Sequence, residues 1–229
     1  MSTLLFGCDV SYCQAPSLVP WEDPRIDFAN VKASEGSSRD PKVELHCERI
    51  RPSGKHLSLY HFFRPDVDPL TQFRTFDDVA AAVGYGNGNP FDVVPDIDVE
   101  YYQGHAVTRA WAPILKELVD MFTESFGGRR PMLYLNYETW LCLGSPGWAL
   151  ECPLWVPFYL REGLTMPQGA LNPKHVPGKS PDWAIWQFGA GRLFGTIQEG
   201  QEGYSVDQNR ARFLPLINGE KLTPPEVNP

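Results

Sequence analysis

Residues 93–100 read Val-Val-Pro-Asp-Ile-Asp-Val-Glu, and this stretch decides the fold class. Branched apolar residues favour a strand, and because side chains alternate along a strand, Asp96, Asp98 and Glu100 would share one face. The apolar face would pack under helices and the acidic face would point to a barrel axis, where neighbouring carboxylates cannot all be ionised. The alternative, solvated acids on an edge strand, is disfavoured by the apolar residues on either side.

Seven more short apolar runs, separated by turn residues, have the composition of strands, at residues 4–10, 30–33, 56–62, 132–136, 153–159, 183–188 and 205–208. Eight runs in all predict a barrel of parallel strands.

Helical patterns lie between the earlier runs. One helix is predicted to begin at Asp40-Pro41, a second to cover about residues 69–83, and a third to carry an apolar stripe over residues 107–122 before Gly127-Gly128 ends it. After residue 132 the helical signals fade. The prediction is therefore an α/β protein, an irregular single-domain (β/α) barrel of the TIM-barrel type with a reduced helix set, over residues 1–215, followed by a C-terminal tail at residues 216–229.

The composition excludes several classes of protein. The 229 residues are 42% hydrophobic, enough for one substantial core, and 28 acidic against 20 basic residues give a net charge of −8, which disfavours nucleic acid as a partner. No secretory signal and no membrane span can be read, so we expect synthesis in the cytoplasm and no membrane insertion. The odd number of cysteines, five, predicts mainly buried free thiols. A disulfide between Cys142 and Cys152 is an alternative that the sequence does not decide.

The acidic strand indicates a reaction type. Carboxylates two residues apart on a strand have Cα atoms about 6.5–7 Å apart, so one can stay protonated beside a charged neighbour. Glycoside hydrolysis requires such a pair, one acid to protonate the leaving oxygen and one group to stabilise the positive anomeric centre. A Mg²⁺ or Ca²⁺ site on Asp96 and Asp98 is the rival interpretation, but no phosphate-binding loop accompanies it.

The other strand ends are polar and aromatic, as expected for a sugar cleft at the carboxyl ends of barrel strands. Each residue alone has an ordinary structural explanation, and their joint placement is the evidence. They are Asp9, Lys32, Glu35, Tyr60, His61, Tyr134, Asn136, Trp155, Tyr159, Trp186, Gln187 and Asp207.

Eight segments, in order along the chain, resemble the family 25 glycoside hydrolases, the Chalaropsis-type lysozymes or N-acetylmuramidases. The segments are residues 7–11, 31–36, 60–65, 98–100, 132–136, 154–155, 186–188 and 206–209. The resemblance implies an irregular β/α barrel that cleaves the β-1,4 bond between N-acetylmuramic acid and N-acetylglucosamine. The sequence departs from the family pattern at Cys13, where the family usually has an aromatic residue, and this change affects one stacking contact at the rim of the cleft.

By the same resemblance, Glu100 is the general acid, Asp98 is the carboxylate on the anomeric side, and Asp9 and Asp207 are flanking acids of the cleft. Asp98 would support a substrate-assisted mechanism with net retention. No metal or cofactor is expected. The predicted substrate-binding residues are Tyr60, His61, Lys32, Tyr134, Asn136, Trp155, Trp186 and Gln187.

Two other functions remain open at this stage, a family 18-like chitinase and an inactive glycan-binding barrel. The expected partner is the glycan strand of peptidoglycan, and the expected state is a monomer. A phage endolysin, made in the host cytoplasm and released to the cell wall or periplasmic peptidoglycan, is the favoured setting, with a secreted bacterial effector or autolysin as the alternative.

Overall fold

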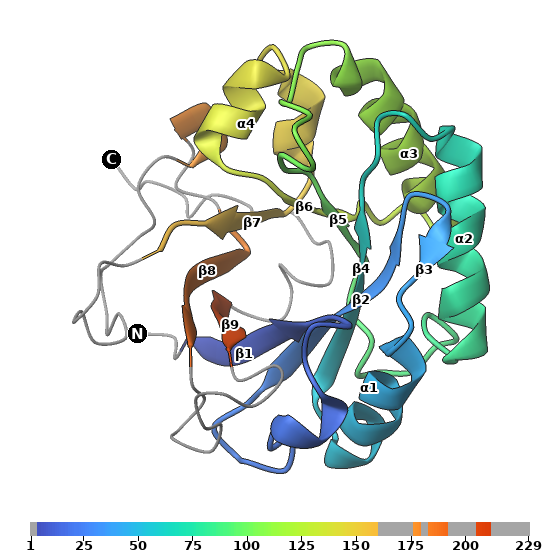
Figure 1. Ribbon diagram of the computed structural model, residues 1–229, viewed down its shortest axis with the longest axis vertical. Coiled ribbons are helices and arrows are strands. Elements are labelled where there is room, and N and C mark those ends of the chain that lie inside the picture. Colours follow the sequence, from blue (N-terminus) through green and yellow to red (C-terminus); the bar gives the residue numbers. More distant parts are fainter. Residues whose placement is uncertain (1–3, 160–175, 180–182, 192–204, 212–229) are drawn as a thin grey trace, which may run out of the picture.

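The computed structural model describes residues 4–159, 176–179, 183–191 and 205–211. Eight strands form a closed barrel in the order β1-β9-β8-β7-β6-β5-β4-β2, and pairing of β1 with β2 closes it (Figure 1). The short β3 extends the sheet beyond β2 as a hairpin. The strands are β1 (Leu5–Val10), β2 (Phe28–Glu35), β3 (Ser38–Arg39), β4 (His56–Phe62), β5 (Asp96–Asp98), β6 (Met132–Tyr134), β7 (Leu154–Pro157), β8 (Ile185–Gly191) and β9 (Val206–Ala211).

The barrel agrees with the predicted α/β class, but the prediction that all its strands are parallel is wrong. β9 runs antiparallel to both of its neighbours, β1 and β8. An antiparallel neighbour needs no crossover helix, in keeping with the weak helical signal late in the sequence. The reversal brings the first residues of β9 to the end of the barrel where the parallel strands finish.

Helices α1, α2 and α3 lie along the outer face of β2, β4 and β5 (Figure 1). The third begins later than predicted, at Trp111, and the six-residue α4 was not predicted because so short a helix presents almost no apolar stripe. The helices are α1 (Val43–Ile50), α2 (Pro69–Ala82), α3 (Trp111–Ser125) and α4 (Tyr137–Cys142), with 3-10 turns at Pro16–Leu18, Arg51–Ser53, Gly147–Glu151 and Pro177–Lys179.

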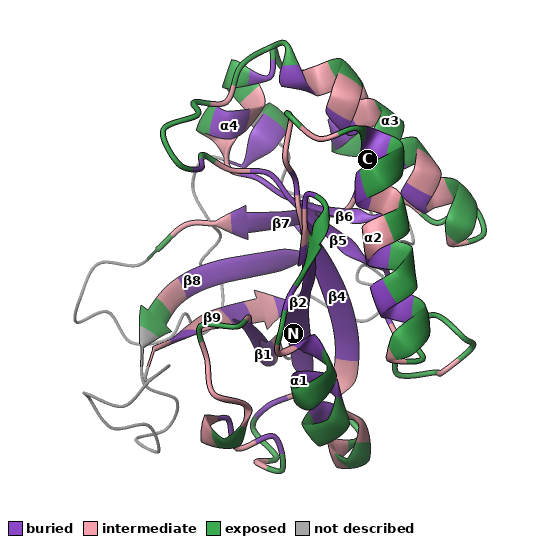
Figure 2. Ribbon diagram, turned by 45° about the vertical axis from the view of Figure 1, so that its right-hand side comes forward, coloured by how far each residue is buried: buried purple, intermediate pink, exposed green. Residues whose placement is uncertain are grey.

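The hydrophobic core has two parts. Between the strands and the helices, outward-facing residues such as Ile97 and Leu133 pack with Phe122 of α3, and the helices expose their opposite faces (Figure 2). Inside the barrel, the amino-terminal end is filled by apolar side chains including Phe28, Met132 and Ile185. Gly7 faces the Phe28 ring so closely that a Cβ there would lie 2.5 Å from it, so this end of the barrel is a packed plug.

The structure also bears on the cysteines, on membrane spans and on the tail. All five cysteines are free thiols, so Cys142 and Cys152 are not bridged. No helix in the described part of the chain has the length and apolarity that a bilayer crossing requires. The predicted tail at residues 216–229 lies outside the described residues.

Candidate active site

The carboxyl end of the barrel interior is polar, in contrast to the apolar plug below it. Strand register places Lys32 beside Tyr60, Asp98 beside Tyr134, and Asp9 beside Asp207. All six are predicted site residues, and Gln187 of β8 joins them through hydrogen bonds to Asp9 and Tyr134. The structure therefore brings most of the predicted cleft together at one end of the barrel.

Gln187 is buried and links three parts of this site. Its side-chain oxygen accepts hydrogen bonds from the hydroxyls of Tyr134 (2.8 Å) and Tyr159 (3.0 Å), and its nitrogen donates to Asp9 Oδ2 (3.1 Å). The hydroxyl of Tyr159 also lies 3.4 Å from Asp207 Oδ1. One amide thus orients two tyrosines and one carboxylate.

Asp9 is only 7% exposed and belongs to a carboxyl pair. Its Oδ2 accepts hydrogen bonds from Asn209 (2.7 Å) and Gln187 (3.1 Å). Burial and the charge of Asp207 nevertheless raise the pKa of Asp9 to about 8, because they outweigh these two donors. Burial also raises the pKa of Asp207. The pair therefore holds a proton at neutral pH.

Asp98 and Glu100 form a second carboxyl pair. Asp98 is the last residue of β5, and Glu100 follows two positions later, less buried than Asp98. Burial and then the charge of Glu100 raise the pKa of Asp98 well above its ordinary value, while burial and then the charge of Asp207 raise the pKa of Glu100. Lys32 lowers the pKa of both acids. One proton on this pair gives a donor and a carboxylate in the same place.

Lys32 is the cationic side chain that lowers the pKa values of Asp98 and Glu100. Its ammonium nitrogen lies 2.5 Å from Glu35 Oε2, and Arg64 lies 3.3 Å from the other oxygen of Glu35. The ammonium group also lies over the ring of Phe62, 4.8 Å from its centre. Glu35 therefore holds Lys32 in place at the edge of the cleft.

Three aromatic rings form the floor of the site. Trp155 meets Tyr134 and Tyr60 edge to face, with ring centres 4.8 and 6.2 Å apart. Its indole nitrogen donates to Asn209 Oδ1 at 2.8 Å. Trp155 is only 2% exposed, so it supports Tyr60 and Tyr134 from below and does not offer an open face for stacking.

Two predicted substrate-binding residues do not face the cleft. His61 is fully buried on the outer side of β4, where its ring nitrogens lie 2.8 Å from Ser34 Oγ and 2.9 Å from Gln72 Oε1 of α2. Trp186 is likewise buried in the outer core, and its indole donates to the carbonyl of Phe158. Their neighbours in sequence, Tyr60 and Gln187, face inward, so strand alternation turns His61 and Trp186 away.

Three further residues belong to this arrangement: one predicted to bind substrate, one that was missed, and one predicted only for the cleft. Asn136 is partly exposed and caps α4, its side chain accepting a hydrogen bond from the Thr139 amide at 2.7 Å. Asn209 was missed as a site residue, although its spacing of two from Asp207 places both on one face of β9. Tyr159 was proposed for the cleft but not among the substrate-binding residues, and it contacts both Gln187 and Asp207.

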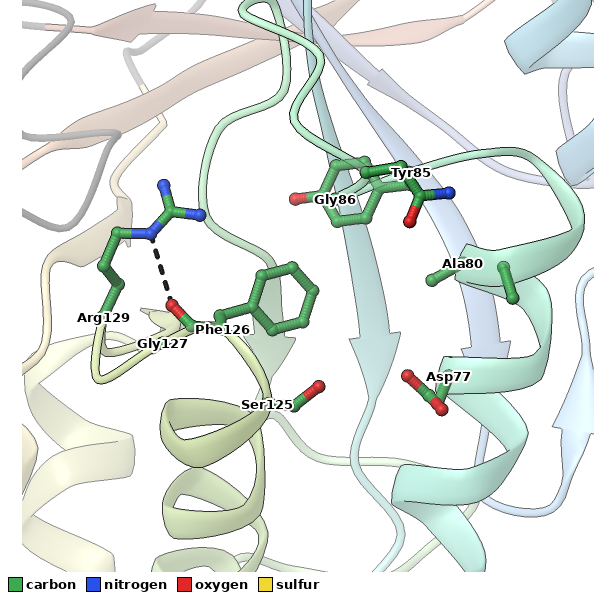
Figure 3. A pocket seen from close by; sticks show the side chains of 10 residues that line it. Asp77, Ala80, Tyr85, Gly86, Ser125, Phe126, Gly127 and Arg129 are labelled. Atoms are coloured by element: carbon green, nitrogen blue, oxygen red, sulfur yellow. Dashed lines mark hydrogen bonds between the residues drawn. The ribbon is translucent and has the colours of Figure 1, made fainter.

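One pocket lies beside the cleft and another lies away from it. A pocket of about 220 Å³ adjoins the site, and its lining includes Tyr12, Lys32 and Arg64. A larger one of about 370 Å³ lies between the C-terminal ends of α2 and α3 and includes none of the predicted site residues (Figure 3). Within the described residues, no group of three or more His, Cys, Asp or Glu side chains is arranged to hold a metal ion. The carboxyl groups of the site interact in pairs, Asp9 with Asp207 and Asp98 with Glu100.

Comparisons with known proteins identify relatives of this barrel. Residues 9–195 match the family described as Glycosyl hydrolases family 25. Two Escherichia coli proteins, both described as Uncharacterized protein YegX, are 28% identical over 139 residues, which is 59% of this chain and 47% of theirs. The match thus spans about half the length of these curated relatives.

Solved structures share the fold. A family 25 lysozyme from Aspergillus fumigatus superposes with a TM-score of 0.73 at 22% identity, covering 95% of this chain and 100% of that one. The spore cortex lytic enzyme SleM of Clostridium perfringens gives 0.68 at 26% identity, covering 91% and 67%. The catalytic domain of an endolysin from a bacteriophage of Listeria monocytogenes gives 0.67 at 16% identity, covering 94% and 96%.

Proposed function

The chain belongs to glycosyl hydrolases family 25, and from this premise we propose that it is a peptidoglycan hydrolase. The bond cleaved is the β-1,4 linkage between N-acetylmuramic acid and N-acetylglucosamine. The observation that carries the proposal is the Asp98–Glu100 pair at the carboxyl end of the barrel, a buried and a partly buried carboxyl that both have a raised pKa. A glycosidase needs this combination of one acid and one carboxylate.

In the proposed mechanism, Glu100 gives its proton to the leaving glycosidic oxygen. Glu100 is the more exposed member of the pair, so its carboxyl is better placed to reach a bound glycan. Asp98, which is 9% exposed, accepts a hydrogen bond from the N–H of the substrate's N-acetyl group. The acetamido oxygen then bonds to the anomeric carbon from the face opposite the leaving group as the glycosidic C–O bond breaks. Water attacks the same carbon from the leaving-group side, gives its proton to the Glu100 carboxylate and opens the ring, so the configuration is retained and the acid is restored.

The other inward side chains bind and orient the sugar in this proposal. Tyr60 and Tyr134 contact the sugar next to the cleaved bond, and Gln187 holds the hydroxyl of Tyr134 in place. Asp9 and Asp207 share a proton and flank the cleft, so that the pair binds hydroxyl groups of the glycan without two full negative charges. Lys32 moderates the negative potential around Asp98 and Glu100.

The proposed biological setting is based on the structural neighbours. We assign the catalytic unit to residues 1–215, acting as a monomer on the glycan strands of peptidoglycan. The fold shared with a phage endolysin catalytic domain supports an endolysin that reaches the cell wall after release from the host cytoplasm. A bacterial autolysin remains the competing setting, since SleM is a spore cortex lytic enzyme of a bacterium.

The test uses Glu100→Gln, which keeps the side-chain shape but cannot deliver a proton. We expect release of reducing ends from purified peptidoglycan to fall by at least about 100-fold, the scale of lost general acid catalysis. Glu117→Gln, an exposed change on α3, is the matched control and should retain full activity. Borohydride labelling of the products should mark muramic acid, and the first product should keep the β configuration.

Four results would contradict the proposal. Retention of more than half the activity by Glu100→Gln removes Glu100 from the mechanism. Label on glucosamine removes the muramidase assignment, and a preference for chitin over peptidoglycan would favour the chitinase alternative. A first product of inverted configuration would mean that a carboxylate activates water directly.

A further inference from the structure

Asp96 is a buried acid that the proposed mechanism does not use. It lies on β5 two residues before Asp98, inside the barrel, and its register partners are Tyr60 on β4 and Met132 on β6. The residue is 0% exposed, and neither carboxyl oxygen has a hydrogen-bond partner among the described residues. Buried polar atoms without partners are rare and costly, so this carboxyl requires an explanation.

The surroundings of Asp96 do not supply what a carboxylate would need. The neighbouring hydroxyl of Ser58 donates to the carbonyl of Val94 at 2.7 Å, and although the same hydroxyl lowers the pKa of Asp96, burial outweighs its effect. Lys32 lies two strands away, about 10 Å in sheet spacing, and is paired with Glu35. The titratable groups around Asp96 are otherwise acidic or phenolic, namely Asp9 of β1, Tyr60 of β4, Tyr85 before β5, and Asp98 of β5 itself.

An isolated carboxylate in such a place takes up a proton instead of remaining charged. Burial, and to a smaller degree the charge of Asp9, raises the pKa of Asp96 well above its ordinary value. A neutral carboxylic acid has one O–H donor, and acceptors face the same interior. One oxygen of Asp98, Oδ1, is itself buried and without a partner among the described residues.

We infer that Asp96 is a positioning residue, a permanently protonated acid whose O–H favours the ionised form of Asp98 and so leaves the shared proton on Glu100. Alternate residues of a strand lie on one face with their Cα atoms about 6.5–7 Å apart. At this separation the carboxyl groups of Asp96 and Asp98 can interact directly or through one bridging water. The inference rests on the proposed function, because it explains which member of the Asp98–Glu100 pair carries the proton. It deepens that function by giving the less buried acid its donor role.

Three forms of the protein separate the roles of charge, hydrogen bonding and packing at this position. Asp96→Asn removes the ionisable group but keeps a donor of the same shape. Asp96→Leu removes the donor and fills a similar volume with apolar atoms, a change that is often neutral or stabilising at an unpaired buried polar site. Thermal unfolding of both variants verifies that the barrel is intact before activity is compared.

The pH dependence of hydrolysis is the first readout. Asp96→Asn should stay within about twofold of wild type, with the acidic limb of its kcat profile unmoved. Asp96→Leu should move that limb up by about one pH unit and lower kcat about tenfold, since one unit of pKa is a tenfold change in where the proton resides. KM should not change, because Asp96 has no exposed surface with which to touch substrate.

Infrared spectroscopy is the second readout and does not depend on catalysis. The difference spectrum between wild type and Asp96→Asn at neutral pH should contain the carbonyl band of a protonated carboxylic acid. A carboxylate band in its place would overturn the inference, as would an acidic limb shifted downward in both variants, or a profile of Asp96→Leu identical to wild type. If wild type itself does not cleave peptidoglycan, the proposed function fails, and the infrared result still decides the protonation of Asp96.

Discussion

Substitution of Asp9 by Asn should make the protein more stable while impairing its proposed activity. Asp9 is buried beside Asp207, and its pKa rises from 3.8 to about 8 on folding. An acid whose pKa is higher in the folded state stabilises the fold fully below the unfolded pKa and loses that contribution as the pH rises through the folded pKa. The relevant window here is pH 3.8 to about 8.

The size of the effect follows from this window. At ~1.4 kcal/mol per pH unit, keeping Asp9 protonated in the folded state at pH 7, where the unfolded chain would ionise it, costs at most about 4 kcal/mol. The pair with Asp207 can move its proton to the other acid, which reduces the penalty that Asp9 alone carries. We therefore expect Asp9→Asn to raise the free energy of unfolding by about 1–3 kcal/mol at pH 7, with its side-chain oxygen still accepting from Asn209 and Gln187.

Urea denaturation of wild type and Asp9→Asn at pH 4, 7 and 8.5 provides the measurement. The two proteins should be nearly equally stable at pH 4, where Asp9 is protonated, and should diverge as the pH rises. Asp78→Asn, which removes an exposed acid from α2, is the matched control and should show no such divergence. A stability difference that is independent of pH, or a variant less stable than wild type at pH 8.5, would refute the argument.

Two further predictions concern the hydrogen-bond centre of the site and its need for metals. Gln187→Leu leaves the hydroxyl of buried Tyr134 without its acceptor and removes one of the two donors to Asp9, so urea denaturation should show that the free energy of unfolding falls by about 2–4 kcal/mol. Tyr159→Phe, at a residue that is 54% exposed, should lower it by less than about 1 kcal/mol. Equal losses in the two variants would mean that Gln187 is not the centre of the hydrogen-bond network. Exhaustive chelation should leave the rate of peptidoglycan hydrolysis unchanged, because carboxylic acids suffice for this chemistry, and a loss restored only by Mg²⁺ or Ca²⁺ would instead support a metal site at Asp96 and Asp98.

Strand positions were predictable because each strand is a short apolar run bounded by turn residues. What the pattern does not contain is strand direction, and β9 shows this, since apolar alternation reads the same in either direction. The prediction that β5 continues to Glu100 was too long for a similar reason. The regular strand ends at Asp98, where pairing stops, although the alternation of residue types continues.

The residues of the candidate site were predictable where the alternation of side chains along a strand was taken into account. Alternation predicted that Asp98 faces the barrel axis, whereas Asp9 and Gln187 were predicted for the cleft from their positions at strand ends, and a hydrogen bond joins these two inside the barrel. His61 and Trp186 were placed in the same cleft although each stands next to an inward-facing residue, and adjacent residues of one strand face opposite sides. The hydrogen bond between Asn209 and Asp9 joins residues 200 positions apart, and only the closure of the barrel brings them together.

The reversed direction of β9 also determines where the described chain enters and leaves the barrel. Leu5, the first residue of β1, lies beside Ala211, the last residue of β9, at the end occupied by the apolar plug. The polar cleft is at the other end. A segment joined to the start of β1 or to the end of β9 would therefore leave the barrel at the end opposite the proposed cleft. The adjacency of the two positions is the geometry in which circular permutation and domain insertion are tolerated.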